Sequence, residues 1–162
     1  MTEPIDVRAQ RPDHPQVAAM LEELDRYLAM LYPPEENHIL GLQALLSPEV
    51  HFMTAWQGEV AIGCGAFRRA TGDETTGGQA YGEIKRMFVR PDRRGQRVGE
   101  RLLQALEAEQ CRQGLGLSLL ETGGEQRAAV RLYERCGYAR RAAFGGYPDN
   151  GSSLFYEKVL SP

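Results

Sequence analysis

The chain lacks most of the features that would set it apart from an ordinary globular protein. It has three cysteines, Cys64, Cys111 and Cys136, whose odd number and wide spacing fit neither a disulfide framework nor a CxxC metal site. No apolar run approaches the roughly 18 residues that span a bilayer. The first ten residues lack a basic segment followed by an apolar one. We therefore expect a cytoplasmic protein that is neither secreted nor inserted in a membrane.

An excess of charge and a cluster of metal ligands are missing as well. The chain has 19 Lys and Arg against 22 Asp and Glu, a net charge of −3, whereas a dedicated nucleic-acid binder is usually basic. His14, His38 and His51 do not share ligand spacing with each other or with the cysteines, so we expect no metal. With 162 residues and no internal repeat or long linker, residues 1–162 are expected to form one domain.

What is present is an ordered series of strand and helix patterns. Strands are expected at residues 5–9, 51–57, 60–69, 81–89, 117–122, 138–143 and 153–159, and helices from Asp13 to Leu31, at 40–46, from about 95–99 to 112, and at 125–135. Asp13 is the expected cap of the first helix, and Gly137 the residue that ends the last one. This order predicts a mixed α/β fold, with a central mixed sheet and helices on both faces.

A basic, glycine-containing turn, RGQRVG at residues 94–99, lies between the strand at 81–89 and a helix. Such a turn offers unpaired N–H groups and the positive end of a helix dipole to an anion. Gly95 and Gly99 allow close approach, and Arg94 and Arg97 add donors for phosphate oxygens. An ordinary turn with solvated arginines is the alternative. The P-loop and dinucleotide patterns are absent, which leaves an acyl-CoA pyrophosphate site.

Two motifs resemble the GNAT superfamily of acetyl-CoA-dependent N-acetyltransferases. RGQRVG is similar to the family's [QR]xxGx[GA] pyrophosphate motif, except that Arg97 stands where the pattern has its middle glycine. We expect Arg97 to keep ordinary helical dihedrals, which any residue but proline can adopt. QRAAVRLYERCGY, residues 126–138, is similar to the family pattern NxxAxxLYxxxG[FY], with Gln126 in place of asparagine. The resemblance implies a single GNAT-like domain with a mostly antiparallel sheet.

The resemblance also implies how acetyl-CoA is held. The family's strand before the turn offers backbone groups to the pantetheine arm and an N–H to the thioester oxygen. The implied cofactor-binding residues are Met87, Phe88, Val89, Arg94, Gly95, Gln96, Arg97, Val98, Gly99 and Gln126. Gln126 would bond the cofactor arm; a solvent-facing residue in the first helical turn is the alternative.

Two residues are implied to carry the chemistry of acetyl transfer to an amine. Tyr133 matches the family tyrosine that can protonate the leaving thiolate, although it could instead be core, since it shares an apolar helix face with Ala129 and Leu132. Glu83 matches the strand position of a general base; the alternative is a solvated carboxylate paired with Lys85 or Arg86. Cys136 has no histidine partner and is expected to be core.

The acceptor is expected to be a primary amine of a small molecule or peptide. Glu35 and Glu36, between the first two helices, could attract a cationic amine, as could Asp149. A non-catalytic acyl-CoA-binding sensor or regulatory module is an alternative function. Nucleic-acid binding through the arginines of residues 90–101 is disfavoured, because the patch has no interleaved aromatics. The oligomeric state stays open, with a homodimer possible.

Overall fold

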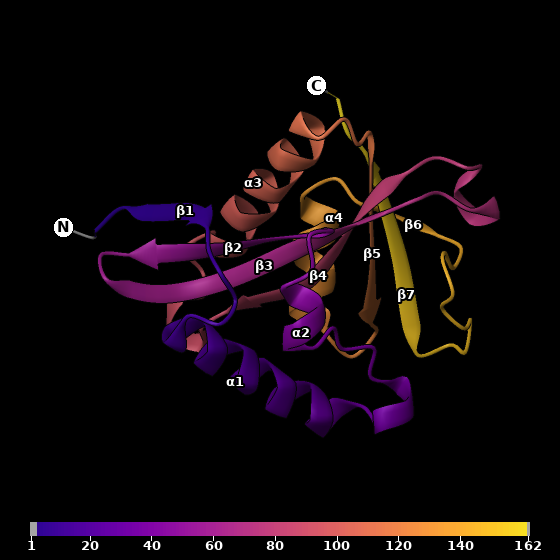
Figure 1. Cartoon of the computed structure of the whole chain (residues 1–162). Helices are drawn as coiled ribbons and strands as arrows, with labels where there is room; N and C mark the ends of the chain where they lie inside the picture. Colours follow the sequence, from indigo (N-terminus) through magenta and orange to yellow (C-terminus); the bar gives the residue numbers. More distant parts are fainter. Residues whose placement is uncertain (1–2, 162) are drawn as a thin grey trace. The chain divides into compact units, whose positions relative to one another are not determined.

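The computed structural model describes residues 3–161 (Figure 1). In chain order, with η for 3-10 helices, the elements are β1 (Ile5–Ala9), α1 (Pro15–Leu31), η1 (Pro34–Glu36), α2 (Leu42–Leu45), β2 (Val50–Gln57), β3 (Val60–Ala70), η2 (Glu74–Thr76), β4 (Tyr81–Val89), η3 (Pro91–Arg93), α3 (Val98–Arg112), β5 (Leu117–Gly123), α4 (Arg127–Arg135), β6 (Ala139–Arg141) and β7 (Ser153–Val159).

The strands form one seven-stranded mixed sheet in the order β1-β2-β3-β4-β5-β7-β6. β4 and β5 pair in parallel, with Glu83 opposite Leu119. The pairs β1–β2, β5–β7 and β6–β7 are antiparallel. The predicted fold class, a mixed sheet combined with helices, is therefore confirmed.

By its internal contacts the chain divides into two compact units. The first holds the residues up to Phe67 together with Lys85–Leu106, and the second holds Arg68–Ile84 and the residues from Glu107 onward. The chain passes from one unit to the other within β3, β4 and α3. The expectation that residues 1–162 form a single domain stays a prediction.

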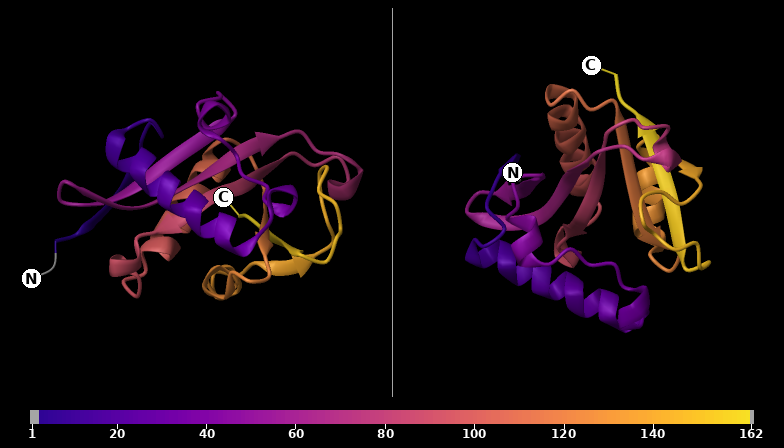
Figure 2. Two further views of the ribbon diagram at one scale, coloured as in Figure 1. Left: turned by 90° about the horizontal axis from the view of Figure 1, so that it is seen from below. Right: turned by 45° about the vertical axis from the view of Figure 1, so that its right-hand side comes forward.

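In the first unit, helices cover both faces of the strands. α1 runs along β2 and β3 (Figures 1 and 2), and its apolar stripe packs with Phe52, Trp56, Cys64 and Ala66. Gly63 and Gly65 instead face α3, where Val98, Leu102 and Leu106 lie close to them. Because successive strand residues point to opposite faces, α1 and the first turns of α3 lie on opposite sides of β3.

The start of α1 differs from the prediction. His14, not Asp13, is the N-cap, and its Nδ1 accepts a hydrogen bond of 3.2 Å from the Gln16 N–H. Asp13 pairs with Arg11 instead, at 2.8 Å. A bidentate ion pair two residues away thus takes the carboxylate that the cap would have used.

Three other elements are shorter than predicted. α2 covers Leu42–Leu45 rather than 40–46, because Gly41 is extended, with φ −75° and ψ 173°. α4 begins at Arg127 rather than 125, since Gln126 has ψ 68°. β6 covers Ala139–Arg141 rather than 138–143. Gly137, with φ 94°, lies directly after the C-cap of α4, as predicted.

In the second unit, α4 and a loop lie on opposite faces of β5 and β7. One face carries Tyr81, Leu117, Leu119 and Phe155, which pack with Phe144 from the loop between β6 and β7. Contacts to α4 come from the other face. The Tyr156 hydroxyl donates to Glu134 at 2.8 Å, and Lys158 Nζ donates to the Cys136 carbonyl at 2.8 Å.

Candidate functional site

The turn at residues 94–99 connects η3 to α3 in the first unit. Arg94 to Arg97 are exposed, whereas Val98 and Gly99 are buried. Arg94 Nε donates to the Val89 carbonyl at 3.3 Å, which ties the turn to the end of β4. The first N–H groups of α3 have no carbonyl partner within the helix. They accompany the positive end of the helix dipole, so the turn is suited to an anion.

The backbone of this turn is left-handed at two residues. Gly95 has φ 84° and Arg97 has φ 62°. The expectation of ordinary right-handed helical dihedrals at Arg97 is therefore wrong. A non-glycine residue in this region costs roughly 1–2 kcal/mol, which is the physical reason why a glycine at this position is easier to accommodate. Left-handed residues in a turn also aim neighbouring N–H groups into one concavity, a known form of anion site.

The arginines around the turn are used differently. Arg93 donates to Gln57 at 3.0 Å and pairs with Asp92 at 2.9 Å, and Arg90 also pairs with Asp92. Arg94 and Arg97 are exposed at the turn itself. Asp92 thus partly neutralises the basic residues of the segment 90–101. The positive charges of Arg94 and Arg97 remain exposed next to the start of α3.

The end of β4 is fixed by close packing in the first unit. Phe88 is buried in the core beneath α1. Met87 packs over Gly65 on the opposite side, beside Leu106 of α3. Gly63 lets the Phe88 carbonyl approach, since an added Cβ would lie 3.0 Å from that oxygen. The strand end that is expected to receive the pantetheine arm is therefore held on both sides.

β4 also contains a strained residue that the sequence did not indicate. Arg86 has φ 58°, and its side chain is only 5% exposed. Its guanidinium pairs with Asp25 of α1 at 2.5 Å and donates to the Leu21 carbonyl at 3.3 Å. Two contacts from one arginine thus fasten α1 to β4.

Glu83 lies in the second unit and is only 1% exposed. Arg68 Nη2 donates to its Oε1 at 3.1 Å, and the Tyr147 hydroxyl donates to its Oε2 at 2.5 Å. The alternative of a solvated carboxylate is therefore wrong, because the side chain is buried and hydrogen-bonded. Arg86, one of the two partners considered for it, pairs with Asp25 instead. A buried carboxylate with charged and hydroxyl partners is an arrangement common at catalytic sites.

Tyr133 is buried on α4, where its ring meets Tyr138 edge-on at 6.1 Å. Burial, and to a lesser extent the charges of Glu121 and Cys136, raise the pKa of Tyr133 well above its ordinary value. Its hydroxyl is therefore protonated at neutral pH and can act as a donor. The Tyr138 hydroxyl forms a hydrogen bond of 2.9 Å with Ser118, so the two tyrosines lie against the face of β5 that carries Ser118. Leu119, and Glu83 opposite it on β4, belong to the other face of the sheet.

Three further predicted residues lie at the start of α4 and in η1. Gln126 is the N-cap of α4 and is partly exposed, and its side chain makes no capping hydrogen bond. Glu35 and Glu36 occupy η1, where Glu35 is exposed and Glu36 partly exposed. Two residues later, the His38 carbonyl accepts from Lys85 Nζ at 3.5 Å, so this segment lies against β4.

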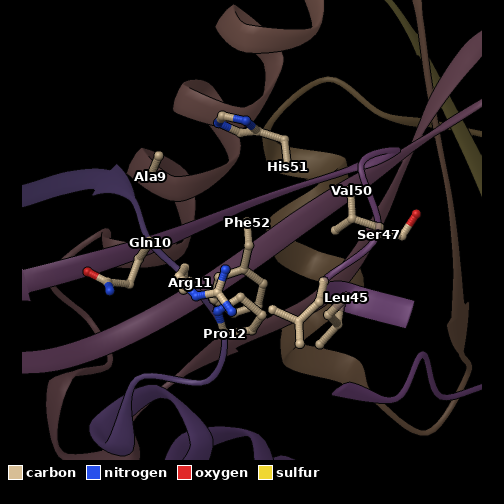
Figure 3. A pocket seen from close by; sticks show the side chains of 10 residues that line it. Ala9, Gln10, Arg11, Pro12, Leu45, Ser47, Val50, His51 and Phe52 are labelled. Carbon is tan, nitrogen blue, oxygen red and sulfur yellow. The ribbon is translucent and has the colours of Figure 1, made fainter. Parts of the chain in front are cut away.

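A cavity of about 380 Å³ lies elsewhere in the first unit (Figure 3). It is lined by Ala9, Gln10, Arg11, Pro12, Leu45, Leu46, Ser47, Val50, His51 and Phe52. None of the predicted site residues is among them. Of its polar lining residues, Arg11 is exposed and pairs with Asp13, whereas Gln10, Ser47 and His51 are partly exposed.

Sequence reasoning missed the contacts that Arg68, Arg86 and Tyr147 make. Tyr147 is 64 residues from Glu83, and Arg86 is 61 from Asp25, so no local spacing indicated either contact. Among residues 3–161, no group of three or more His, Cys, Asp or Glu could hold a metal ion. In the same described stretch, no helix is long and apolar enough to span a bilayer.

Comparison with known proteins gives a consistent result. Residues 17–138 match the family model described as "Acetyltransferase (GNAT) family". The chain is 44% identical over 156 residues to a protein named IAA acetyltransferase from Azospirillum brasilense, covering 96% of this chain and 98% of the relative. A putative acyl-CoA N-acyltransferase from Klebsiella pneumoniae has a TM-score of 0.79 and 32% identity, covering 97% and 98%. The PaiA N-acetyltransferase of Thermoplasma acidophilum, solved with coenzyme A, shares the fold at a TM-score of 0.73 and 18% identity, covering 97% and 99%.

Proposed function

Because this chain belongs to the GNAT family of acetyltransferases, we propose that it moves an acetyl group from acetyl-CoA to a primary amine of a small molecule or peptide by direct transfer. The observation that carries this proposal is the turn at residues 94–99. This turn is suited to a pyrophosphate because it has two left-handed residues and exposed arginines and leads into the start of a helix. The shared fold with an acetyltransferase solved with coenzyme A supports the same cofactor.

The residues of the turn fit the anionic part of acetyl-CoA. No atom lies within 4 Å of where a Cβ on Gly95 would be, so there is room above the turn for a ligand. The N–H groups of residues 95–99 and the side chains of Arg94 and Arg97 would bind the phosphates. Backbone groups of Met87, Phe88 and Val89 would hold the pantetheine arm, and the Gln126 amide would bond it. The bound cofactor supplies a thioester, the activated acetyl group.

Glu83 is the proposed general base. An amine in water at neutral pH is mostly an ammonium, and it must lose a proton before it can attack a carbonyl. Glu83 is a buried carboxylate held in one orientation by Arg68 and Tyr147, which suits proton transfer directly or through a water. The acidic side chains of Glu35 and Glu36 would favour the approach of a cationic amine.

Tyr133 is the proposed general acid. The leaving thiolate needs a proton, and the Tyr133 hydroxyl, whose pKa burial raises above its ordinary value, is protonated at neutral pH and can supply one. The buried Cys64 offers no covalent route, because burial raises the pKa of its thiol to about 12 and leaves it protonated. The proposal is therefore transfer within one complex of enzyme, acetyl-CoA and amine.

The acceptor class, a homodimer and a cytoplasmic location stay predictions. Thiol release from acetyl-CoA, measured with a panel of amino compounds and peptides, tests the function. The proposal expects release that depends on both the amine and the enzyme. Tight acetyl-CoA binding, measured by calorimetry, without release for any amine would instead indicate the sensor module.

A further inference from the structure

Glu83 shares its buried site with a tyrosine from a distant loop. We propose that Tyr147 is a positioning residue for acetyl transfer, which holds the Glu83 carboxylate in the orientation that accepts a proton from the acceptor amine. This inference rests on the proposed function, because it needs Glu83 to be the base.

The loop between β6 and β7 fixes Tyr147 over β4. The Tyr147 ring packs against Phe144 and Phe155, with ring centroids 5.4 and 5.8 Å away. The Gly145 N–H donates to Thr75 Oγ1 at 3.2 Å, so the loop is also tied to η2. With its ring held in this way, the hydroxyl reaches Glu83 Oε2 at 2.5 Å.

The two donors on Glu83 have complementary effects. Arg68 contributes a positive charge at Oε1, and its side chain is 43% exposed. Tyr147 contributes a neutral, partly buried donor at Oε2. With one donor on each oxygen, the plane of the carboxylate is fixed.

The charged and titratable groups near this pair come from four elements. Arg68 belongs to β3, Tyr81 to β4 and Glu121 to β5, and Tyr147 itself comes from the loop. Burial first, and then the charge of Glu83, raise the pKa of Tyr147 well above its ordinary value. Tyr147 therefore keeps its proton during turnover and acts as a donor only.

The chain offers a matched control in the same unit. Tyr156 donates to Glu134 at 2.8 Å on the α4 face, so it also forms a tyrosine–glutamate hydrogen bond. Phenylalanine at either tyrosine keeps the ring and removes the hydroxyl. Only Tyr147→Phe takes a donor from the proposed base.

The test compares kcat and the KM for the amine in the full chain and in its Tyr147→Phe, Tyr156→Phe and Glu83→Gln variants, with acetyl-CoA and an accepted amine. Tyr147→Phe should lower kcat by about tenfold and leave the KM close to wild type, because the proposed base loses the donor that orients it. Tyr156→Phe should leave both values unchanged, and Tyr147→Phe should melt near the wild-type temperature.

Two results would overturn the proposal, and they are distinguishable. If Glu83→Gln lowers kcat strongly but Tyr147→Phe leaves it unchanged, Tyr147 has no positioning role and the proposed function stands. If Glu83→Gln keeps the wild-type kcat, Glu83 is not the base, and both assignments fail. As a further check, adding Tyr147→Phe to Glu83→Gln should change the rate no further, because the tyrosine acts through the glutamate.

Discussion

Arg97 combines a side chain suited to phosphate with a backbone conformation suited to glycine. Its φ of 62° is stabilised by the turn around it, not by its own preference. At the scale of the residue, the molecule therefore accepts a local cost at the turn where an anion is expected to bind. Strain of this kind often marks a functional site, and here it can be separated from the charge by substitution.

Two substitutions at Arg97 separate its backbone from its guanidinium. Arg97→Ala removes the charge but keeps a Cβ, and with it the backbone strain, so the KM for acetyl-CoA should rise by about fivefold with little change in stability. Arg97→Gly also removes the strain, and its free energy of unfolding should exceed that of Arg97→Ala by roughly 0.5–1 kcal/mol. Urea unfolding and initial rates measure both effects. An unchanged KM in both variants would show that the guanidinium makes no phosphate contact.

Tyr133 is either a catalytic acid or a buried core residue, and phenylalanine distinguishes the two. Tyr133→Phe keeps the ring contact with Tyr138 and should leave the melting temperature and acetyl-CoA binding close to wild type. If the hydroxyl protonates the thiolate, kcat should fall by about 100-fold. A kcat equal to that of the wild type would assign Tyr133 to the core alone.

At the scale of elements, the end of β4 is positioned by glycines on β3. An added Cβ on Gly63 would lie 3.0 Å from the Phe88 carbonyl and 3.1 Å from side-chain carbons of both Val98 and Leu102. The strand that leads into the turn and the first turns of α3 would both have to move. The geometry of the expected anion site thus depends on Gly63, a residue that has no functional side chain.

Gly63→Ala should therefore affect stability and cofactor binding together. Overpacking of this kind costs about 1–3 kcal/mol of unfolding free energy, and the KM for acetyl-CoA should rise because the turn shifts. Gly41→Ala is the control, since no atom lies within 4 Å of its added Cβ. Thermal melts and acetyl-CoA titration check the pair. A Gly63→Ala variant as stable as Gly41→Ala would contradict the packing argument.

The sequence predicted elements better than the contacts between them. The stripe from Val17 to Leu31 predicted α1, and short runs of strand-forming residues predicted β2, β3 and β7, because these patterns are local. The cap at Asp13 failed, since an ion pair with Arg11 competes for the carboxylate. Glu83 was identified from the resemblance, but its burial and its bond to Tyr147 depend on a loop 64 residues away.

At the scale of the whole molecule, several tyrosine hydroxyls are removed from water. Burial is the largest cause that raises the pKa of Tyr133, Tyr138 and Tyr147 above the ordinary value of about 10. The folded chain keeps these protons, while the unfolded chain releases them near pH 10. The stabilisation is therefore fully present below about pH 10 and is lost as the pH rises above it.

The free energy of unfolding should accordingly begin to fall near pH 9, where the unfolded chain releases the proton of the Cys64 thiol, and fall more steeply above about pH 10. Each buried tyrosine contributes at most about 1.4 kcal/mol per pH unit to this slope. Urea unfolding across this range measures it. Tyr138→Phe should reduce the slope, and Tyr27→Phe should not, because Tyr27 is exposed. A flat profile up to pH 11 would mean that the hydroxyls ionise in the folded state.

The central claim is that this chain transfers acetyl groups from acetyl-CoA to an amine in one step, and following the acetyl group tests it most directly. Acetyl-CoA labelled with ¹³C in the acetyl group is incubated with the enzyme and an accepted amine, and the products are weighed by mass spectrometry. The account predicts N-acetylated amine and free CoA in equal amounts, unlabelled enzyme, and strongly reduced product with Glu83→Gln. Labelled acetyl on the enzyme itself, or CoA release without N-acetylated amine, would contradict it.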